Sequence, residues 1–175
     1  MIRKFNIIVI VAAGLWLSGC RRPTAFKEVQ VPGKFTMDVP VYMQAATDLF
    51  GGNTATLQYE SDSAKVYMLV FDTARQNLNE RTLRQYYDSI VADPSVKNAH
   101  ISSPRPVMVN TDSALTSDMS AIAGNIPLYY RIEVIATPKR FYYILLWCRS
   151  DKRRRLKKDL DKVMGSFTDI NHSKV

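Results

Sequence analysis

One short segment, residues 65–72, restricts the fold most, because it is apolar on both faces of a strand. Alternate positions place aliphatic side chains and Met on one face and mostly aromatic ones on the other: Val66, Met68 and Val70, then Tyr67, Leu69 and Phe71. A strand of this kind is stable only when both faces of its sheet are covered. The sequence therefore predicts a sheet with a further layer on each side.

The remaining periodic segments add strands and two helices. Apolar residues at helical spacing, followed by Asp93-Pro94, predict a helix over residues 79–92. Apolar alternation and apolar runs predict strands over residues 35–39, 54–60, 107–110, 113–121, 128–136 and 140–149. After Ser150, the expected N-cap, a second helix has one apolar stripe, formed by Leu156, Leu160, Val163, Met164 and Phe167. This order predicts an α+β domain, in which helices pack against an antiparallel sheet.

The same features resemble the PsbP-like fold. They are the opening segment 35–40 (Phe-Thr-Met-Asp-Val-Pro), the helix after the third strand, the long final hairpin, and a closing helix that ends in Gly165-Ser166-Phe167. The family includes extrinsic proteins of photosystem II, a Ran-binding nuclear transport factor and many small bacterial lipoproteins. The resemblance implies an α/β/α sandwich in a non-catalytic adaptor or assembly protein, although a fold by itself does not fix a function.

The first 20 residues resemble the signal of a bacterial lipoprotein. Arg3 and Lys4 precede an uncharged apolar segment, residues 7–17, that is too short to span a bilayer. It leads into Leu17-Ser18-Gly19-Cys20, which is similar to a lipobox. In that family the cysteine receives a diacylglycerol group, with acyl chains such as palmitate, and the signal peptide is cut off before it. The resemblance implies that Cys20 is the lipidation site and the membrane anchor.

On this interpretation the chain has four parts. Residues 1–19 are a signal peptide, residues 20–30 are the lipidated cysteine and a tether, residues 31–170 form a single α+β domain, and residues 171–175 are a polar tail. A tether of this length extends to about 30 Å. Enterobacterial lipoproteins of the inner membrane have Asp after the cysteine, where this chain has Arg21. We therefore expect, in a Gram-negative cell, an outer-membrane lipoprotein that faces the periplasm.

Few residues offer catalytic or metal-binding chemistry. The sequence has no Cys-x-x-Cys, His-Glu-x-x-His or phosphate-binding glycine loop, so we expect no metal, no cofactor and no enzymatic activity. Cys148 follows an apolar run and is expected to be a buried, unreactive thiol. One catalytic alternative remains, a hydrolase that combines His100 with a serine and with Asp112 or Asp118.

The positive charge of the chain is concentrated in the last helix. Six of the seven residues 152–158 are Lys or Arg, and loss of Arg3 and Lys4 with the signal lowers the formal charge from +8 to +6. At 100° per residue, four cations point away from the apolar stripe: Arg154, Arg155, Lys158 and Lys162. One interpretation is a solvated helix face. The other is a functional surface, because cations in the first turn oppose the helix dipole, and a local cost without visible compensation is a reason to suspect function.

Three functions follow from these observations. The first is a docking or assembly module that binds anionic lipid or an acidic envelope protein, but no nucleic acid. Its candidate residues are Arg154, Arg155, Lys157 and Lys158. The second is a small-ligand binder with an apolar pocket between sheet and helix, and its candidate residues are Tyr86, Tyr129 and Tyr143. The third is the hydrolase that uses His100.

Overall fold

A computed structural model describes residues 23–49, 54–78, 81–92 and 99–171, and within these ranges the chain forms strands, two α-helices and two 3₁₀ turns. The first half contains β1 (Phe26–Val31), β2 (Phe35–Pro40), β3 (Gln44–Ala45), β4 (Leu57–Ser61), β5 (Val66–Ala74), η1 (Arg75–Leu78) and α1 (Leu83–Val91). The second half contains β6 (His100–Ile101), β7 (Arg105–Val109), β8 (Asp112–Ala123), β9 (Ile126–Ala136), β10 (Arg140–Arg149), η2 (Ser150–Lys152), α2 (Arg153–Gly165) and β11 (Thr168–Asp169). None of these helices is long and apolar enough to cross a membrane.

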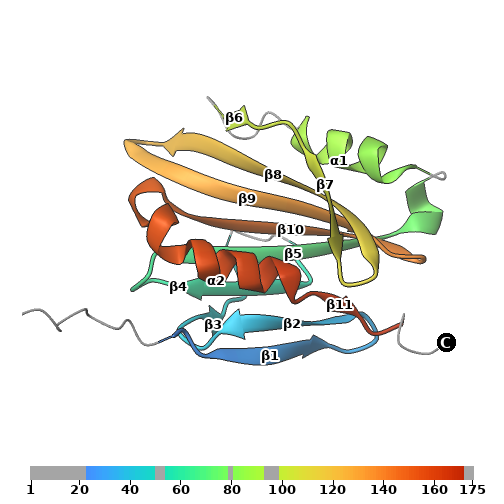
Figure 1. The fold of residues 1–175 in the computed structure, drawn as a ribbon, viewed down its shortest axis with the longest axis horizontal. Coiled ribbons are helices and arrows are strands. Elements are labelled where there is room, and N and C mark those ends of the chain that lie inside the picture. The colour runs from blue at the N-terminus through green and yellow to red at the C-terminus, as the bar shows by residue number, and fades with distance from the viewer. Residues whose placement is uncertain (1–22, 50–53, 79–80, 93–98, 172–175) are drawn as a thin grey trace, which may run out of the picture.

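The strands form two antiparallel sheets (Figure 1). The larger has eight strands, with the order β3-β4-β5-β10-β9-β8-β6 and with β7 paired to β8. The smaller has three strands in the order β1-β2-β11, so it brings together segments from both ends of the chain. Short turns connect β8 to β9 and β9 to β10, which makes the second half a meander of long strands.

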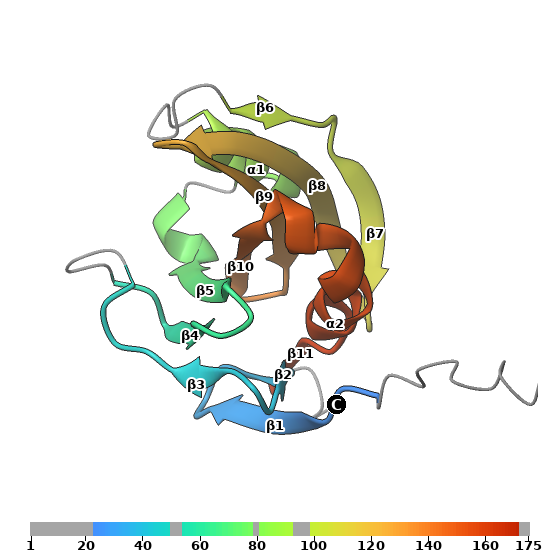
Figure 2. The same ribbon diagram turned by 90° about the vertical axis from the view of Figure 1, so that its left-hand side faces the viewer.

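Two apolar cores lie on opposite faces of the large sheet. On one face, α2 and the small sheet cover side chains that include Val66, Met68 and Val70. On the other face, α1 and flanking loops cover Leu69, with Tyr67 and Phe71 at its margin. The prediction that residues 65–72 are covered on both sides is therefore confirmed, and the domain is the expected α+β type with a helix on each face of the sheet (Figure 2).

Several element boundaries differ from the sequence prediction. Residues 26–30, expected to belong to the tether, form β1 together with Val31 and pair with β2 along its whole length. The helix predicted over 79–92 spans only Leu83–Val91, where Thr82 and Gln85 form a capping box. Asp93-Pro94, the expected stop, lies outside the described residues. Ser150 is not the N-cap of the last helix, because a 3₁₀ turn intervenes and places Lys152 at that position.

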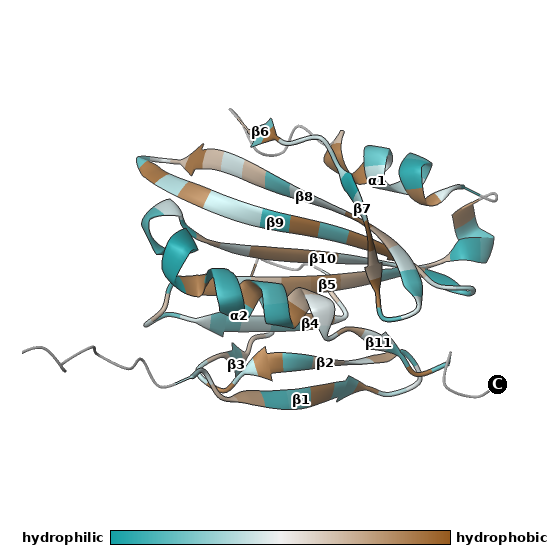
Figure 3. Ribbon diagram, in the orientation of Figure 1, coloured by the Kyte–Doolittle hydropathy of each residue, from teal (hydrophilic) through white to brown (hydrophobic). Residues whose placement is uncertain are grey.

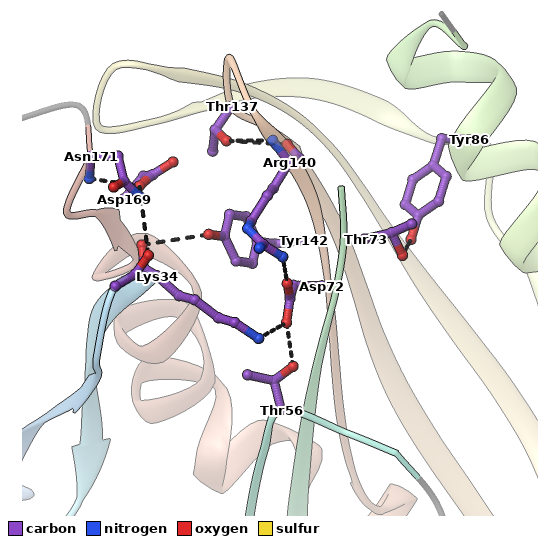
Figure 4. A network of polar contacts seen from close by, with 11 residues as sticks. Lys34, Thr56, Asp72, Thr73, Tyr86, Thr137, Arg140, Tyr142, Asp169 and Asn171 are labelled. Atoms are coloured by element: carbon purple, nitrogen blue, oxygen red, sulfur yellow. Dashed lines mark hydrogen bonds and ion pairs between the residues drawn. The ribbon is translucent and has the colours of Figure 1, made fainter. Parts of the chain in front are cut away.

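A buried carboxylate connects the two sheets (Figure 4). Asp72 of β5 accepts hydrogen bonds from Lys34, in the β1–β2 turn, and from Thr56, and it forms an ion pair with Arg140 of β10. Burial alone would raise the pKa of Asp72, but the hydrogen bonds from Lys34 and Thr56 outweigh that effect and hold the pKa below its usual value. This cluster fixes the small sheet against one end of the large one.

Candidate functional site

The exposed side of α2 is strongly cationic. Leu156, Leu160, Val163 and Met164 are buried beneath the helix, as predicted, and the hydropathy of the ribbon changes sharply across it (Figure 3). The opposite side exposes four cations, which we call the cationic surface: Arg154, Arg155, Lys157 and Lys158.

Some cations of this segment have acidic partners and others do not. Lys157 pairs with Asp161 one turn along the helix at 2.5 Å, and Lys162 pairs with Asp38 at 3.4 Å. Arg153 pairs with Asp118 of β8 at 3.2 Å. Arg154, Arg155 and Lys158 form no ion pair with any described residue, so their charge faces solvent.

The start of α2 does little to offset this charge. The first turn contains no acidic residue, and Lys152 at the N-cap position makes no side-chain hydrogen bond to the helix. The nearest acid upstream is Asp151 in η2, which pairs with Arg149 and Lys152 on either side. The unfavourable combination of cations and helix dipole that the sequence predicted is therefore present in the structure.

A half-open cavity of about 260 Å³, lined mostly by residues with polar side chains, lies beside the start of α2, over β6, β8 and β9. Its centre is a contact among three side chains, in which Tyr129 donates to Asp118 at 2.6 Å and Arg153 covers the Tyr129 ring at 4.2 Å. Burial and the hydrogen bond to Asp118 raise the pKa of Tyr129 to about 12. The full lining is His100, Ser102, Asp118, Met119, Ser120, Tyr129 and Arg153.

The three candidate pocket tyrosines do not meet. Tyr129 lies on the α2 face of the sheet, whereas Tyr86 and Tyr143 belong to the core on the α1 face. Tyr86 stacks on Phe141 at 4.6 Å and bonds to Thr73 through its hydroxyl, and Tyr143 stacks on Phe71 at 5.5 Å. The expected apolar pocket is therefore not formed by these residues. Tyr129 is opposite Cys148 in the register of β9 and β10, and Cys148 is five positions from Tyr143, so the two tyrosines project from opposite faces of the sheet.

The hydrolase alternative brings the correct residue types together without the required contacts. His100 lines the cavity with Asp118, Ser102 and Ser120. A catalytic triad needs the carboxylate to orient the imidazole, but both oxygens of Asp118 are engaged, one by Tyr129 and the other by Arg153. Asp112 is buried at the far end of β8, opposite Val109. No triad is therefore assembled among the described residues.

Other expectations concern cysteine and metal chemistry. Cys148 is fully buried, and burial raises the pKa of its thiol to about 11, so the group is unreactive at neutral pH. No group of three His, Cys, Asp or Glu side chains that could hold a metal occurs among the described residues. Cys20 lies outside them, and its lipidation stays a prediction.

Sequence reasoning missed two charged residues beneath α2. Arg131 and Glu133 project from the α2 face of β9, where Arg131 forms an ion pair with Asp161. Glu133 is 3% exposed, and its Oε1 has no hydrogen-bond partner among the described residues. Burial raises the pKa of Glu133 to about 7, against a smaller opposing effect of Arg131. The signal in the sequence was the spacing of two charges at alternate positions in an otherwise apolar strand.

No family model and no curated protein sequence matches this chain. Solved structures do resemble it. The cyanobacterial PsbP protein (CyanoP) of Synechocystis superposes with a TM-score of 0.65 at 11% identity, over 89% of this chain and 98% of that one. LpqN of Mycobacterium tuberculosis, described as involved in cell envelope biogenesis, has a TM-score of 0.58 at 9% identity, over 85% and 92%.

A third similar structure is the Ran-binding protein Mog1p of Saccharomyces cerevisiae, with a TM-score of 0.55 at 11% identity, over 83% of this chain and 96% of that one. At these identities the likeness shows the fold alone. The chain therefore has a PsbP-like fold, as the sequence features predicted.

Proposed function

We propose that this chain is a non-enzymatic lipoprotein of the bacterial cell envelope, anchored through acylated Cys20, whose cationic surface on α2 docks against an anionic surface. The anionic surface is either a membrane with acidic lipids or an acidic envelope protein. The observation that supports docking is the exposure of Arg154, Arg155 and Lys158 without acidic partners among the described residues, at a helix start where cations are unfavourable.

Three further observations agree with this function. The Leu17 to Cys20 segment is similar to a lipobox and follows an apolar run too short to remain as a membrane span. LpqN, one of the proteins with this fold, is described as involved in cell envelope biogenesis. The cavity beside α2 lacks an imidazole held by a carboxylate. In a Gram-negative cell we place the protein at the periplasmic face of the outer membrane.

The test compares wild-type protein with a variant in which Arg154, Arg155, Lys157 and Lys158 are all Gln. Both cores are built from residues within 26–167, so the acyl group can be left out by using residues 21–175. We expect the wild type to bind vesicles that contain phosphatidylglycerol at low salt, with about 1 kcal/mol per engaged cation. Binding should fall as ionic strength approaches 0.5 M, where the Debye length is roughly 4 Å.

The Gln variant should lose this binding yet melt at the same or a slightly higher temperature, since repulsion with the helix dipole is relieved. Lys139, exposed in the turn at the other end of the domain, supplies a control substitution to Gln. If the four-Gln variant binds vesicles and acidic protein as well as the wild type does, the cationic surface has no docking role.

A second function, binding of a small polar ligand, is favoured by one observation, the polar cavity at Tyr129. It replaces the apolar pocket expected from the sequence. Ligand binding there would displace Arg153 from the Tyr129 ring, because the guanidinium now covers that ring at 4.2 Å. Mass spectrometry of the protein isolated from its native envelope, under non-denaturing conditions, tests whether a small molecule accompanies it.

A further inference from the structure

The chain enters the domain at one end of its long axis, which we call the entry end. Thr24 donates a hydrogen bond to Asp159 of α2 at 3.0 Å, and Tyr42 donates to the same carboxylate at 2.9 Å. The chain is therefore held against α2 from Thr24 onward. Only four peptide steps separate Thr24 from Cys20, and they span about 14 Å at most. An acyl group on Cys20 would keep α2 close to the membrane surface, not 30 Å away from it.

The entry end also exposes apolar side chains. The described residues include four large hydrophobic side chains that are strongly exposed: Val41 at 53%, Met108 at 63%, Ile122 at 58% and Ile126 at 48%. Ile122 and Ile126 flank the β8–β9 turn, next to Pro127. Val41 follows β2, and its N–H bonds to the carbonyl of Ala25. Three of the four thus lie at the entry end, and Met108 lies near the opposite end, beside the β7–β8 turn.

Strand register places the charged and apolar groups together. Arg149 pairs with Leu128, the third residue of β9, so η2 and the start of α2 lie at the same end of the large sheet as the β8–β9 turn. Figure 1 shows this turn, the start of α2 and the first described residues at the same end of the molecule, and Figure 2 views that end face on. One end of the domain therefore combines exposed isoleucines, the cationic surface and the start of the chain.

We propose that the entry end is the membrane-binding face of the domain, and that the β8–β9 turn, residues 122–127, inserts Ile122 and Ile126 into an anionic bilayer. This proposal rests on the proposed docking by the cationic surface and names its partner as lipid. A lipid surface fits all three groups, because it offers phosphates to the cations and an acyl boundary to the isoleucines. An acidic protein would account for the cations but not for the exposed isoleucines. In addition, the short segment between an acylated Cys20 and Thr24 would hold this end of the domain at the bilayer.

The test locates the turn in the mature, lipidated protein reconstituted in vesicles. Asn125→Cys in the β8–β9 turn and Thr111→Cys in the β7–β8 turn are matched sites, since both residues are exposed and each follows a residue with positive φ. A fluorophore can be attached at either position alone, because Cys148 is buried and Cys20 is acylated. The vesicles contain phosphatidylglycerol and lipids with brominated acyl chains, which quench a fluorophore within the bilayer.

We expect the probe at residue 125 to be quenched and the probe at residue 111 to be unaffected. Changing Ile122 and Ile126 to Ser should remove the quenching at 125, whereas Met108→Ser should not. Equal quenching at both sites, or none at 125, would overturn the proposal. In that case, the unlipidated domain can be tested separately: if it binds anionic vesicles and the four Gln substitutions abolish that binding, the docking role of the cationic surface stands and only the proposed orientation is wrong. Quenching at 125 that is unchanged by the four Gln substitutions would instead remove the docking role of the cationic surface.

Discussion

Glu133 and Arg131 are two charged side chains that the sheet holds beneath a helix. Buried charges are stable in proteins only when they are paired and hydrogen-bonded. Arg131 meets this requirement in part through Asp161, but Oε1 of Glu133 and Nε of Arg131 have no hydrogen-bond partner among the described residues. Burial raises the pKa of Glu133 to about 7, so the protonated form prevails in the folded protein only below neutral pH.

This environment predicts that stability depends on pH. Burial raises the pKa of Glu133 from 4.5 to about 7, so the folded state keeps a proton that the unfolded chain loses above pH 4.5. The contribution of this group to stability is complete below pH 4.5 and declines as the pH rises to 7, by ~3 kcal/mol. Glu133→Gln, which cannot ionise, should lose none of it. Urea denaturation at pH 4.5 and pH 7.5 measures the free energy of unfolding. Relative to wild type, this free energy should be higher for the variant at pH 7.5 than at pH 4.5.

A matched control is Glu28→Gln on β1, where the carboxylate is exposed and hydrated in the folded protein. The same difference between Glu133→Gln and wild type at both pH values would mean that the buried carboxylate is ionised throughout, held by Arg131.

The last helix illustrates what a sequence pattern can and cannot predict. Four residues of the apolar stripe were predicted correctly, because 3.6-residue spacing leaves little choice of buried face. The fifth, Phe167, is buried as expected but follows the C-cap Ser166 and is not part of the helix. The cap was wrong, because Ser150 has the right side chain but a 3₁₀ turn moves the N-cap two residues along the chain, to Lys152. Such a shift depends on tertiary contacts of η2 with β9, which local sequence does not contain.

The missed first strand has a comparable cause. β1 is the edge of a three-stranded sheet, and its apolar side chains are only half-buried, so polar residues occupy the rest of it. Such an edge strand shows weak alternation and resembles a polar linker. The grouping of Tyr86, Tyr129 and Tyr143 in one pocket was wrong for a different reason. The sequence indicated that each tyrosine lies in an apolar segment, but not which of the two cores it would join.

Phe167 joins α2 to the small sheet, and its removal should be costly. It follows the C-cap, is fully buried, and packs on Tyr142 at 4.7 Å and on Phe35 at 5.1 Å between ring centroids. Phe167→Ala should destabilise the domain by ~3 to 5 kcal/mol and lower the midpoint of thermal unfolding by roughly 10 °C. Circular dichroism melts measure this shift, with exposed Met108→Ala as the control. A midpoint within a degree of wild type would contradict the packing described for this ring.

At the scale of the whole molecule, the domain has two unlike ends. One end is closed by the Asp72 cluster and its neighbours Lys34 and Arg140. The other exposes isoleucines and cations where the chain begins. The sequence predicted the fold class, the signal segment and the cluster of cations. It did not predict that the cations and the exposed isoleucines lie at the same end of the domain, because only the register of β8, β9 and β10 brings these segments together.

The proposed anchoring through Cys20 gives a direct prediction. Cys20→Ala removes the only thiol that the lipobox resemblance assigns to acylation, so mature-sized protein should disappear from the detergent phase of a Triton X-114 separation of cells. Cys148→Ala is the control, because that thiol is buried within the domain. Persistence of a mature, detergent-partitioning band in the Cys20→Ala strain would show that another feature anchors the protein.

The three-stranded sheet also sets an order of events in time. β11 pairs with Phe35 and Thr36 of β2, so the sheet near the start of the chain cannot be completed before its last residues are available. Contacts between such distant parts of a sequence form late, because long loops must close first. During synthesis from the N-terminus, β2 would therefore lack its second neighbour until residues 168–169 have emerged, and the small sheet would be the last part of the domain to be completed.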